Sequence, residues 1–271
     1  MAGFLARQER FAVVGSTNDV VRGWLADGTP EVCLAVADEQ SAGRGREGRT
    51  WRAPAGHALL LSLGFRPSWL APGQVWRLAA AVSLSMAEAA EAITGLPGGA
   101  IRLKWPNDLE SSGELAGGKL AGVLGETDGL GGPDPRAIIG IGVNTNWARA
   151  DFPSELAATM TSLGEVSGAP VDQVALLDAF LSGLEARIDA LRDGRFDVGE
   201  WAGRQLTTGR DVELIAPDGA VTTVRALGVD GVTGALVVED PSVPGGERRV
   251  VVGEIRHVRV PAATSPARAG V

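Results

Sequence analysis

The feature that most constrains the fold is the run from Trp76 to Ile93, which is rich in Ala and Leu and contains neither Gly nor Pro. Alanine and leucine favour the helical conformation, and few polar side chains interrupt the run. It therefore predicts a largely buried helix, which neighbouring elements must cover.

Short apolar runs on both sides of this helix predict strands. The strands are expected at Phe11–Val14, Val32–Ala37, Ala58–Phe65, Ile101–Trp105, Lys119–Glu126 and Ala137–Val143. Further helices are expected over Asp19–Ala26, after the cap-forming residues Ser16–Asn18, and over the amphipathic stretch Val171–Leu191. Residues 109–118 contain three Gly and two Ser, and they predict an exposed loop.

The chain changes character after Trp201, where short β runs alternate with turns. The runs are Asp211–Ile215, Val221–Leu227, Ala235–Val238, Arg249–Val252 and Arg256–Val260. Such a series predicts a small all-β barrel. We therefore expect an α+β domain over residues 1–205, a small β domain over residues 206–260, and a disordered tail over residues 261–271, which are rich in Ala, Pro and Ser.

Composition excludes several classes of protein. A net charge of −8 argues against a general nucleic-acid binder, no apolar run approaches the roughly 20 residues needed to cross a bilayer, and the N-terminus lacks a secretory pattern. The single cysteine, Cys33, excludes an intrachain disulfide, fits a reducing cytoplasm and is expected in the core. The two histidines, His57 and His257, are far apart and have no cysteine nearby, which argues against a zinc site or a histidine-based triad.

Gly43–Trp51 carries three Gly, three Arg and one Trp within nine residues. Glycine at this density predicts a mobile segment, and arginine suits phosphate or carboxylate, so the segment is a candidate lid over an anionic ligand. Alone, it is more typical of an idle surface loop or an RNA-contacting segment. Glu47 argues against RNA, and Trp51 argues against an idle loop because its ring can stack on a purine.

Other short motifs also have ordinary explanations. Ser16–Asn18 is typical of a helix cap, although the same groups at a helix N-terminus can bind a small polar ligand. The segment Lys104–Asp108 is typical of a turn, yet it offers a cation, an amide and a possible Mg²⁺ ligand. Lys119 could be a solvated strand end, and Asn144 could belong to a polar turn.

Taken in order, these motifs resemble those of biotin–protein ligases. The matching segments are Ser16–Asn18, Gln40–Trp51, Lys104–Asp108, KLAG from Lys119 and GVN ending at Asn144. The resemblance is close over residues 16–146, and the β-rich end corresponds to that family's SH3-like domain. It implies an α+β fold, with a catalytic domain like that of class II aminoacyl-tRNA synthetases (a mixed sheet with helices) followed by an SH3-like β-barrel.

The resemblance also implies the reaction. Biotin's carboxylate attacks the α-phosphate of MgATP to give biotinyl-5′-AMP and pyrophosphate, and a lysine of a biotin carboxyl carrier domain then takes the biotinyl group and releases AMP. Independently of the family, positive charge from Lys119, Arg46, Arg49 and Mg²⁺ suits a step that brings a carboxylate to a polyphosphate. A closing loop suits an intermediate that water would hydrolyse.

The resemblance assigns roles position by position. The biotin-binding positions are Ser16, Thr17, Asn18, Gln40, Gly43, Arg44, Arg46, Trp51 and Lys119. The ATP-binding positions are Arg46, Arg49, Trp51, Lys104, Asn107, Lys119 and Asn144. The catalytic positions are Lys119, which bridges the biotin carboxylate and the α-phosphate, Arg46, which restrains the adenylate, and Asp108. Asp108 is the candidate Mg²⁺ ligand or orients the incoming lysine, and both roles stay open.

The chain departs from the family pattern at Glu47, often a basic residue, at Gly118, often arginine, and in the long spacer 109–118. Because the first motif begins at Ser16, we expect no N-terminal DNA-binding domain and no repressor role. The expected enzyme is cytoplasmic, does not bind membranes, and is a monomer or a homodimer. The rival interpretations are a lipoate–protein ligase, which the loop and Lys104–Asp108 disfavour, and a non-catalytic biotin or nucleotide sensor, which the presence of Lys119 disfavours.

Overall fold

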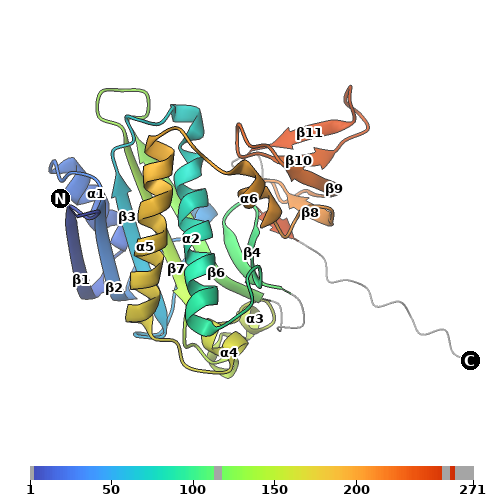
Figure 1. Cartoon of the computed structure of the whole chain (residues 1–271). Helices are drawn as coiled ribbons and strands as arrows, with labels where there is room; N and C mark the ends of the chain where they lie inside the picture. The colour runs from blue at the N-terminus through green and yellow to red at the C-terminus, as the bar shows by residue number, and fades with distance from the viewer. Residues whose placement is uncertain (1–2, 113–117, 252–256, 260–271) are drawn as a thin grey trace, which may run out of the picture. The chain divides into compact units, whose positions relative to one another are not determined.

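In the computed structural model the chain consists of two compact units, Met1–Arg204 and Gln205–Val271. The structure describes residues 3–112, 118–251 and 257–259 (Figure 1). The expected tail at residues 261–271 lies outside these residues. Within the described residues, no helix combines the length and apolarity needed to span a bilayer.

A seven-stranded sheet forms the centre of the first unit, in the order β1-β2-β3-β7-β6-β5-β4. Strands β1 and β2 are parallel, and every other neighbouring pair is antiparallel. The strands are β1 (Arg7–Val14), β2 (Cys33–Gln40), β3 (Ala58–Phe65), β4 (Ile101–Lys104), β5 (Asp108–Ser111), β6 (Gly118–Asp128) and β7 (Arg136–Asn144). Strand β3 is buried along its whole length, as expected for a central strand covered on both faces.

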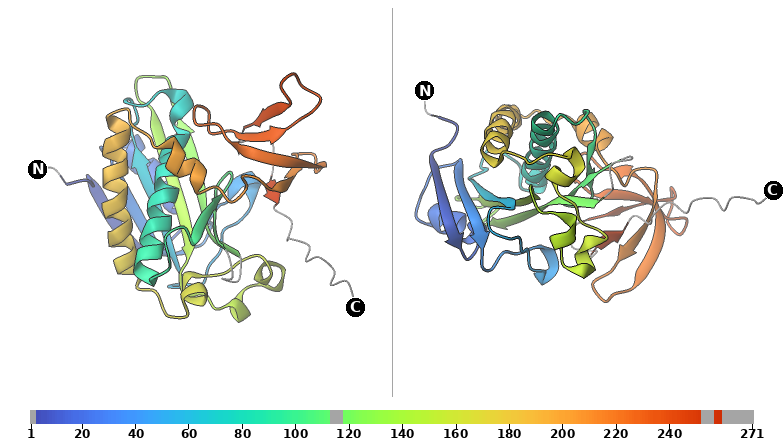
Figure 2. Two further views of the ribbon diagram at one scale, coloured as in Figure 1. Left: turned by 45° about the vertical axis from the view of Figure 1, so that its right-hand side comes forward. Right: turned by 90° about the horizontal axis from the view of Figure 1, so that it is seen from below.

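Helices cover both faces of this sheet, as the view from below shows (Figure 2). Helices α2 (Trp76–Thr94) and α5 (Gln173–Arg192) pack together on one face, and α1 (Thr17–Ala26) lies on the other. Most of α2 is buried, which confirms the prediction from its Ala/Leu-rich sequence. Helix α2 ends at Gly95, whose φ of 68° is the left-handed conformation that glycine adopts most easily.

The core under α1 contains the chain's cysteine. Val21, Trp24 and Leu25 of α1 pack on Cys33 of β2 and its neighbours. A Cβ at Gly64 of β3 would lie 2.6 Å from the Cys33 sulfur, so the glycine permits this close packing. Burial raises the pKa of the Cys33 thiol to about 11, and the thiol is a core group, as predicted.

Shorter elements connect these layers. They are the helices α3 (Ser154–Ala157), α4 (Leu163–Ser167) and α6 (Val198–Gly203), and the 3₁₀ turns η1 (Arg46–Gly48), η2 (Pro72–Gln74) and η3 (Arg149–Asp151). Helices α4, α5 and α6 begin with side-chain caps from Ser162, Asp172 and Asp197. Such caps satisfy backbone N–H groups that have no partner within the helix.

The second unit contains a five-stranded antiparallel sheet in the order β11-β10-β9-β8-β12. Its strands are β8 (Asp211–Ile215), β9 (Val221–Val229), β10 (Leu236–Glu239), β11 (Glu247–Val250) and β12 (His257–Arg259). Its described core contains Val212, Leu214, Ala226, Leu236 and Val238, each at most 4% exposed. The five predicted β runs are confirmed with small shifts at their ends; Val252, Arg256 and Val260 lie outside the described residues.

Two local predictions need correction. The spacer 109–118 is not all loop, because its first part is β5, which pairs with both β4 and β6, and its last residue begins β6; residues 113–117 are outside the described residues. Helix α1 begins at Thr17 rather than Asp19, and Ser16 occupies the cap position without a side-chain hydrogen bond to the helix. The polar residues in both segments satisfy local turn rules, but tertiary pairing decides their conformation.

Candidate functional site

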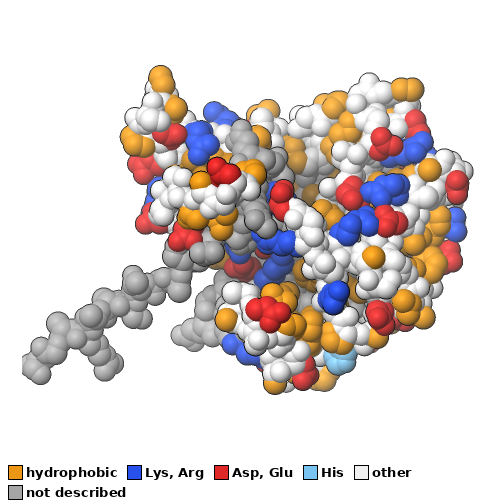
Figure 3. All heavy atoms as spheres, turned by 180° about the vertical axis from the view of Figure 1, so that it is seen from behind, with side chains coloured by type: hydrophobic (Ala, Val, Ile, Leu, Met, Phe, Trp, Pro, Cys, Tyr) orange, Lys and Arg blue, Asp and Glu red, His pale blue; other side chains and the backbone are white. Residues whose placement is uncertain are grey.

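Strand register brings side chains from distant motifs to the face of the sheet that carries α1. Ser62 of β3 lies opposite Gly140 of β7, and Gly142 of β7 lies opposite Gly122 of β6. Gly122 in turn lies opposite Asp108, and Asp108 lies opposite Lys104 of β4. Because opposed residues share a face, this row crosses from the centre of the sheet to its β4 edge. Charged side chains of both signs alternate over the side seen from behind in Figure 3.

A β-bulge turns Lys119 toward this row. Leu109 pairs with Ala121, but the next residue, Glu110, pairs with Lys119, so Leu120 is an extra residue in β6. Strict alternation back from Gly122 would direct Lys119 to the α2 face. The extra residue brings it instead onto the face of Asp108, as bulges commonly do beside functional sites.

Lys119 and Asp108 form the central ion pair of the site. The Lys119 Nζ lies 2.6 Å from Asp108 Oδ1, and the Asp108 side chain is 7% exposed. Lys104 Nζ lies 2.6 Å from Glu110 Oε1 and 3.9 Å from Asp108 Oδ2. Four charges from three strands are thus interleaved, which keeps each lysine ammonium oriented although it is largely removed from water.

Ser16–Asn18 is buried, and hydrogen bonds join it to three strands. Thr17 donates to Gln40 Oε1 from its backbone N–H (2.7 Å) and its hydroxyl (3.0 Å). Ser62 Oγ lies 2.7 Å from Thr17 Oγ1 and 2.5 Å from Asn18 Oδ1. The Asn18 amide donates to Glu126 at 2.6 Å. These polar groups are therefore held by a network that reaches β2, β3 and β6, well beyond a helix cap.

The Gly43–Trp51 loop has a hairpin conformation. The Trp51 N–H donates to the Gly43 carbonyl (2.9 Å), and Arg44 pairs with Thr50 in an isolated antiparallel bridge. At the tip, η1 contains Glu47 with φ of 56°, a conformation that non-glycine residues seldom adopt. Glu47, which the resemblance marks as a departure from the family pattern, occupies the turn itself.

Arg46 lies in the electrostatic field of Asp108, one member of the central pair. Burial lowers the pKa of its guanidinium, and the negative charges of Glu47 and Asp108 oppose that effect. Arg46 therefore stays a cation at neutral pH, and its side chain is half-buried. A half-buried guanidinium near Asp108 is suited to contact an anion.

The Trp51 indole packs directly on the backbone of two glycines, Gly142 and Gly122. A Cβ at Gly142 would lie 2.6 Å from the indole, and one at Gly122 would lie 3.1 Å from it. The ring also packs against the cluster of Trp147, Phe152 and Met160. Lys119 Nζ is 5.5 Å from the ring centroid, within range of a cation–π contact. The buried indole N–H finds no acceptor among the described residues.

Other predicted positions make backbone contacts. The Asn107 amide donates to the Val123 carbonyl at 3.0 Å, and the fully buried Asn144 donates to the Thr161 carbonyl at 3.1 Å. The backbone of Arg49 closes the hairpin by accepting from the Gly45 N–H. The Arg44 guanidinium is directed to Asp19 and Glu126 rather than to Lys119.

The sequence predictions missed the residues that support this site. Ser62 is the polar residue in the otherwise apolar β3, and Glu126 lies near the end of β6. Gly140 and Gly142 alternate with isoleucine and valine in β7, so one face of that strand lacks side chains at these two positions. A Cβ at Gly140 would lie 2.2 Å from Asn18 Oδ1. Alternating glycines in a strand and a lone serine in an apolar run are the signals that could have revealed them.

The described residues contain no group of three or more His, Cys, Asp or Glu side chains placed to hold a metal ion. Asp108, paired with Lys119, is a lone carboxylate in this respect. Magnesium is commonly bound by one or two carboxylates together with substrate phosphates, and this donor set fits that mode rather than a cage made by the protein.

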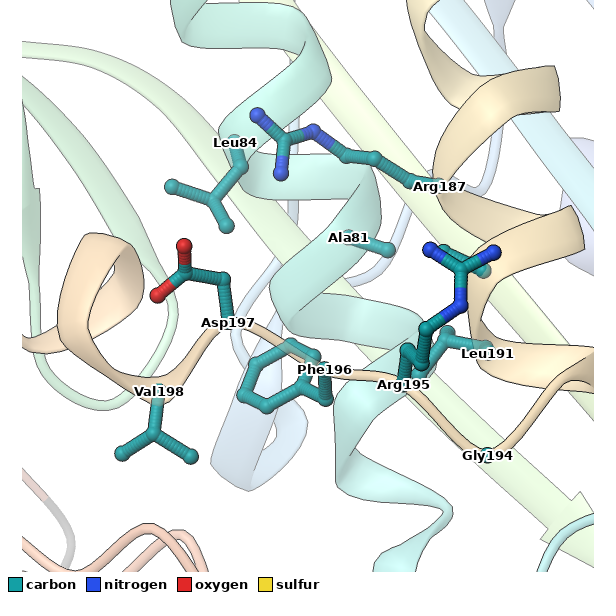
Figure 4. A pocket seen from close by; sticks show the side chains of 10 residues that line it. Ala81, Leu84, Arg187, Leu191, Gly194, Arg195, Phe196, Asp197 and Val198 are labelled. Carbon is teal, nitrogen blue, oxygen red and sulfur yellow. The ribbon is translucent and has the colours of Figure 1, made fainter.

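A separate cavity of about 600 Å³ lies on the helix side of the sheet, between α2, α5 and the segment before α6 (Figure 4). Leu84, Leu191 and Phe196 line it, and Arg187 stands at its wall. Arg187 is already paired with Glu88 and Glu200, at 2.8 Å and 2.7 Å. The cavity shares no residue with the Lys119 site.

Comparisons with known proteins identify relatives of this chain. Residues 11–144 match the model of the "Biotin/lipoate A/B protein ligase family". The chain is 32% identical over 253 residues to the biotin–[acetyl-CoA-carboxylase] ligase of Mycobacterium tuberculosis, covering 92% of this chain and 88% of that protein. It is 31% identical to the bifunctional ligase/repressor of Escherichia coli, covering 85% of this chain and 68% of that protein.

Among solved structures, the biotin protein ligase of Aquifex aeolicus in complex with biotin and ATP has a TM-score of 0.76 and 26% identity. The match covers 94% of this chain and 99% of that chain, so it includes the mixed sheet and the small β unit. The likeness confirms the predicted fold class, an α+β unit followed by a small β unit. By sequence and by fold, this chain belongs to the biotin–[acetyl-CoA-carboxylase] ligases of the biotin/lipoate A/B protein ligase family.

Proposed function

We propose that this protein activates biotin with ATP and transfers the biotinyl group to a lysine of a biotin carboxyl carrier domain. The observation that carries the proposal is the Lys119–Asp108 pair, which lies on the same sheet face as the Ser16–Asn18 network and against Trp51 at the end of the Gly/Arg loop. An enzyme that forms biotinyl-5′-AMP from biotin and ATP needs a polar biotin pocket, a cation near the carboxylate and phosphate, and a loop that closes over the ligand.

The biotin pocket consists, in this proposal, of Ser16, Thr17, Asn18 and Gln40, with Gly43, Arg44, Arg46, Trp51 and Lys119 at its open side. Hydroxyl and amide groups at the start of α1 suit the donors and acceptors of biotin's ureido ring. Because Ser62 and Glu126 already orient Thr17 and Asn18, little ordering remains to be done when biotin binds. Trp51 supplies an apolar surface for the hydrocarbon part of the ligand.

In the first step the biotin carboxylate attacks the α-phosphorus of ATP and pyrophosphate leaves. Both reactants are anions, so the positive charges of Lys119 and Arg46 hold them together and stabilise the charge that develops. Asp108 would be the protein carboxylate that holds a Mg²⁺ ion brought with ATP, and that ion would offset phosphate charge. Arg49, Lys104, Asn107 and Asn144 are the remaining proposed ATP-side positions, together with Trp51.

In the second step the acceptor lysine attacks the acyl carbon of biotinyl-5′-AMP, an amide forms, and AMP leaves. The amine must lose a proton, and a carboxylate within reach can accept it. Asp108 is the proposed acceptor of that proton once Lys119 is engaged with the phosphate. The adenylate is prone to hydrolysis, so the Gly43–Trp51 loop is proposed to keep water out until the carrier domain docks.

The proposed partner is the biotin carboxyl carrier domain of a biotin-dependent carboxylase. The relatives named as biotin–[acetyl-CoA-carboxylase] ligases support it. A cytoplasmic location is proposed because the reaction uses ATP and the chain's only cysteine is a reduced core thiol. In the same proposal residues 1–204 carry the chemistry, and the unit from Gln205 on is an SH3-like accessory domain.

The experiment that tests this function is exchange of labelled pyrophosphate into ATP. Purified protein should catalyse exchange that depends on biotin and does not occur with lipoate. Exchange supported by lipoate but not by biotin would overturn the substrate assignment. Exchange with biotin but no transfer to a carrier domain would restrict the activity to the first step.

A further inference from the structure

Arg44 is held by two carboxylates outside the Gly/Arg loop. Its NH1 and NH2 donate to Asp19 Oδ2 and Oδ1, both at 2.7 Å, in the two-pronged geometry of a strong arginine–carboxylate pair. Its NH2 also lies 3.5 Å from Glu126 Oε2. Asp19 belongs to the first turn of α1 and Glu126 to β6, so one side chain joins the loop to both elements.

The same two carboxylates are tied to the biotin-side network. Glu126 accepts from the Asn18 amide at 2.6 Å, and Asp19 follows Asn18 in the chain. Arg22, on the next turn of α1, also contacts both carboxylates, at 2.6 Å from Asp19 and 2.9 Å from Glu126. Arg22 lies within the helix, so of these two arginines only Arg44 connects the carboxylates to the loop.

A hold on Arg44 is transmitted to the functional end of the loop. Arg44 follows Gly43, whose carbonyl accepts from the Trp51 N–H, and its own backbone pairs with Thr50. Next along the chain, Gly45 donates to the Arg49 carbonyl at 2.7 Å. The hairpin therefore behaves as one piece, and fixing Arg44 fixes both Arg46 and Trp51.

We propose that Arg44 is a positioning residue: its clamp on Asp19 and Glu126 holds the loop closed, with Arg46 and Trp51 over the reacting groups. The loop arginines thus have different roles: the backbone of Arg44 borders the pocket while its guanidinium binds Asp19 and Glu126, and Arg46 faces the ligand. The clamp rests on the proposed function, since its purpose is to retain biotinyl-5′-AMP until transfer.

The clamp persists over the physiological pH range. The hydrogen bond and charge of Arg44 lower the pKa of Asp19 below its ordinary value of 3.8, while Arg22 adds to the effect. A carboxylate with a lowered pKa keeps its pairing at any pH above its ordinary value and loses it as the pH falls through the lowered one. The Arg44–Asp19 pairing itself therefore does not titrate at pH values above 3.8.

The clamp adds little to global stability, because the side chains of Arg44 and Asp19 are 36% and 50% exposed. The small contribution to stability distinguishes the Arg44 clamp from an ion pair whose role is to stabilise the fold. Removing it should leave the melting temperature nearly unchanged while loosening the loop. A readout confined to the loop is therefore required.

The first test is native-state trypsin cleavage of the full chain without ligand, with peptides identified by mass spectrometry. Asp19→Asn keeps every arginine and should raise cleavage after Arg46 or Arg49 by about three- to tenfold. Arg22→Ala is the matched control, since it removes contacts to the same carboxylates without touching the loop, and its loop cleavage should match wild type. Equal loosening by both variants, or none by Asp19→Asn, would overturn the clamp.

The second test measures release of biotinyl-5′-AMP from enzyme loaded with biotin and ATP. Arg44→Ala and Asp19→Asn should each speed release by about three- to tenfold, and the double variant should do no more than Arg44→Ala alone, because that change already breaks every contact of the clamp. Arg44→Lys, which keeps the charge but not the fork, should fall between. Additive effects, or release unchanged by Arg44→Ala, would contradict the clamp.

The two tests distinguish this inference from the proposed function. If wild-type protein formed no biotinyl-5′-AMP, the proposed function would fail, yet the cleavage comparison of Asp19→Asn with Arg22→Ala would still decide whether the loop is clamped.

Discussion

Single residues in this site have roles that their identity alone does not reveal. Lys119 is a strand-end lysine in sequence, but in the structure it forms a short ion pair with a nearly buried carboxylate and lies near an indole face. Asp108 restrains that ammonium and, in turn, is restrained by it. Because the two side chains restrain each other, we expect substitution of Lys119 to affect biotin transfer and substitution of Asp108 to affect adenylate formation.

We expect Lys119→Ala to lower biotin-dependent pyrophosphate exchange by about 10²- to 10³-fold, the usual effect of losing one preorganised charge at a transition state. Lys119→Arg keeps a cation but changes its geometry, and should recover part of the rate. Circular dichroism checks that the variants fold. Exchange near the wild-type rate in Lys119→Ala would remove this lysine from the chemistry.

Ser62 offers a test of the biotin-side network. Ser62→Ala leaves Thr17 and Asn18 without the hydroxyl that lies between them, and we expect about a fivefold to tenfold loss of biotin affinity from one lost buried hydrogen bond. Ser85→Ala is the matched control, because Ser85 is an equally buried serine on α2 whose hydroxyl has no hydrogen-bond partner among the described residues. Calorimetric titration with biotin measures both. Equal affinity in the two variants would exclude Ser62 from the pocket.

At the scale of elements, much of the first unit could be predicted from sequence. Periodicity located β3 to the residue and α2 to within one residue, because apolar runs and the absence of glycine are local signals. Strand β5 was missed, since the polar sequence Asp108–Ser111 becomes a strand only by pairing on both sides. The bulge at Leu120 was missed for the same reason: it exists only relative to β5.

The site residues divide in the same way, into features that local sequence predicts and features that depend on tertiary pairing. Motif order identified Lys119, Arg46 and Ser16–Asn18 as a group, but it gave no sign that Arg44 faces away from Lys119. Directions of side chains depend on register and on partners such as Asp19, Ser62 and Glu126, which lie in other elements. Sequence reasoning finds residue types at intervals, whereas the structure adds their orientation.

The end of α2 is anchored by a nearly buried ion pair, which gives a prediction at this scale. Glu91 accepts from the N–H groups of Gly99 and Ile101, both at 2.9 Å, and from Arg204 at 2.6 Å. Glu91→Gln removes the charge that compensates Arg204, and we expect a loss of about 3 kcal/mol in the free energy of unfolding. Urea denaturation measures it. The control Glu88→Gln removes a more exposed carboxylate of the same helix and should cost under about 1 kcal/mol.

At the scale of the whole molecule, the first unit separates support from chemistry. Helices α2 and α5, with the cavity beside them, lie on one face of the seven-stranded sheet, and the proposed reacting groups lie on the other. The helices therefore support the strands that carry the reacting groups, without contributing charge to the site. Substitutions in α2 and α5 should therefore lower the free energy of unfolding more than they lower the rate of the proposed reaction.

The ion pairs of Lys104 and Lys119 bear on whether the enzyme can be acylated by the adenylate that it makes. Apart from these two, the chain contains no lysine; every other basic side chain, histidines aside, is an arginine, which acyl adenylates do not label under the conditions that label amines. Both ammonium groups are bound to carboxylates and at most 24% exposed. An acyl donor released from this enzyme therefore meets almost no nucleophilic side-chain amine on the protein that made it.

We therefore expect no biotin on Lys104 or Lys119 after prolonged incubation with biotin and ATP in the absence of a carrier domain, as judged by peptide mass spectrometry. Arg210→Lys, which places an amine at an exposed position, should become labelled under the same conditions and shows that the donor was present. Biotin on Lys119 in the wild-type chain would mean that its pairing with Asp108 does not protect it. In this protein, then, the choice of arginine over lysine across the surface makes the enzyme a poor substrate for itself.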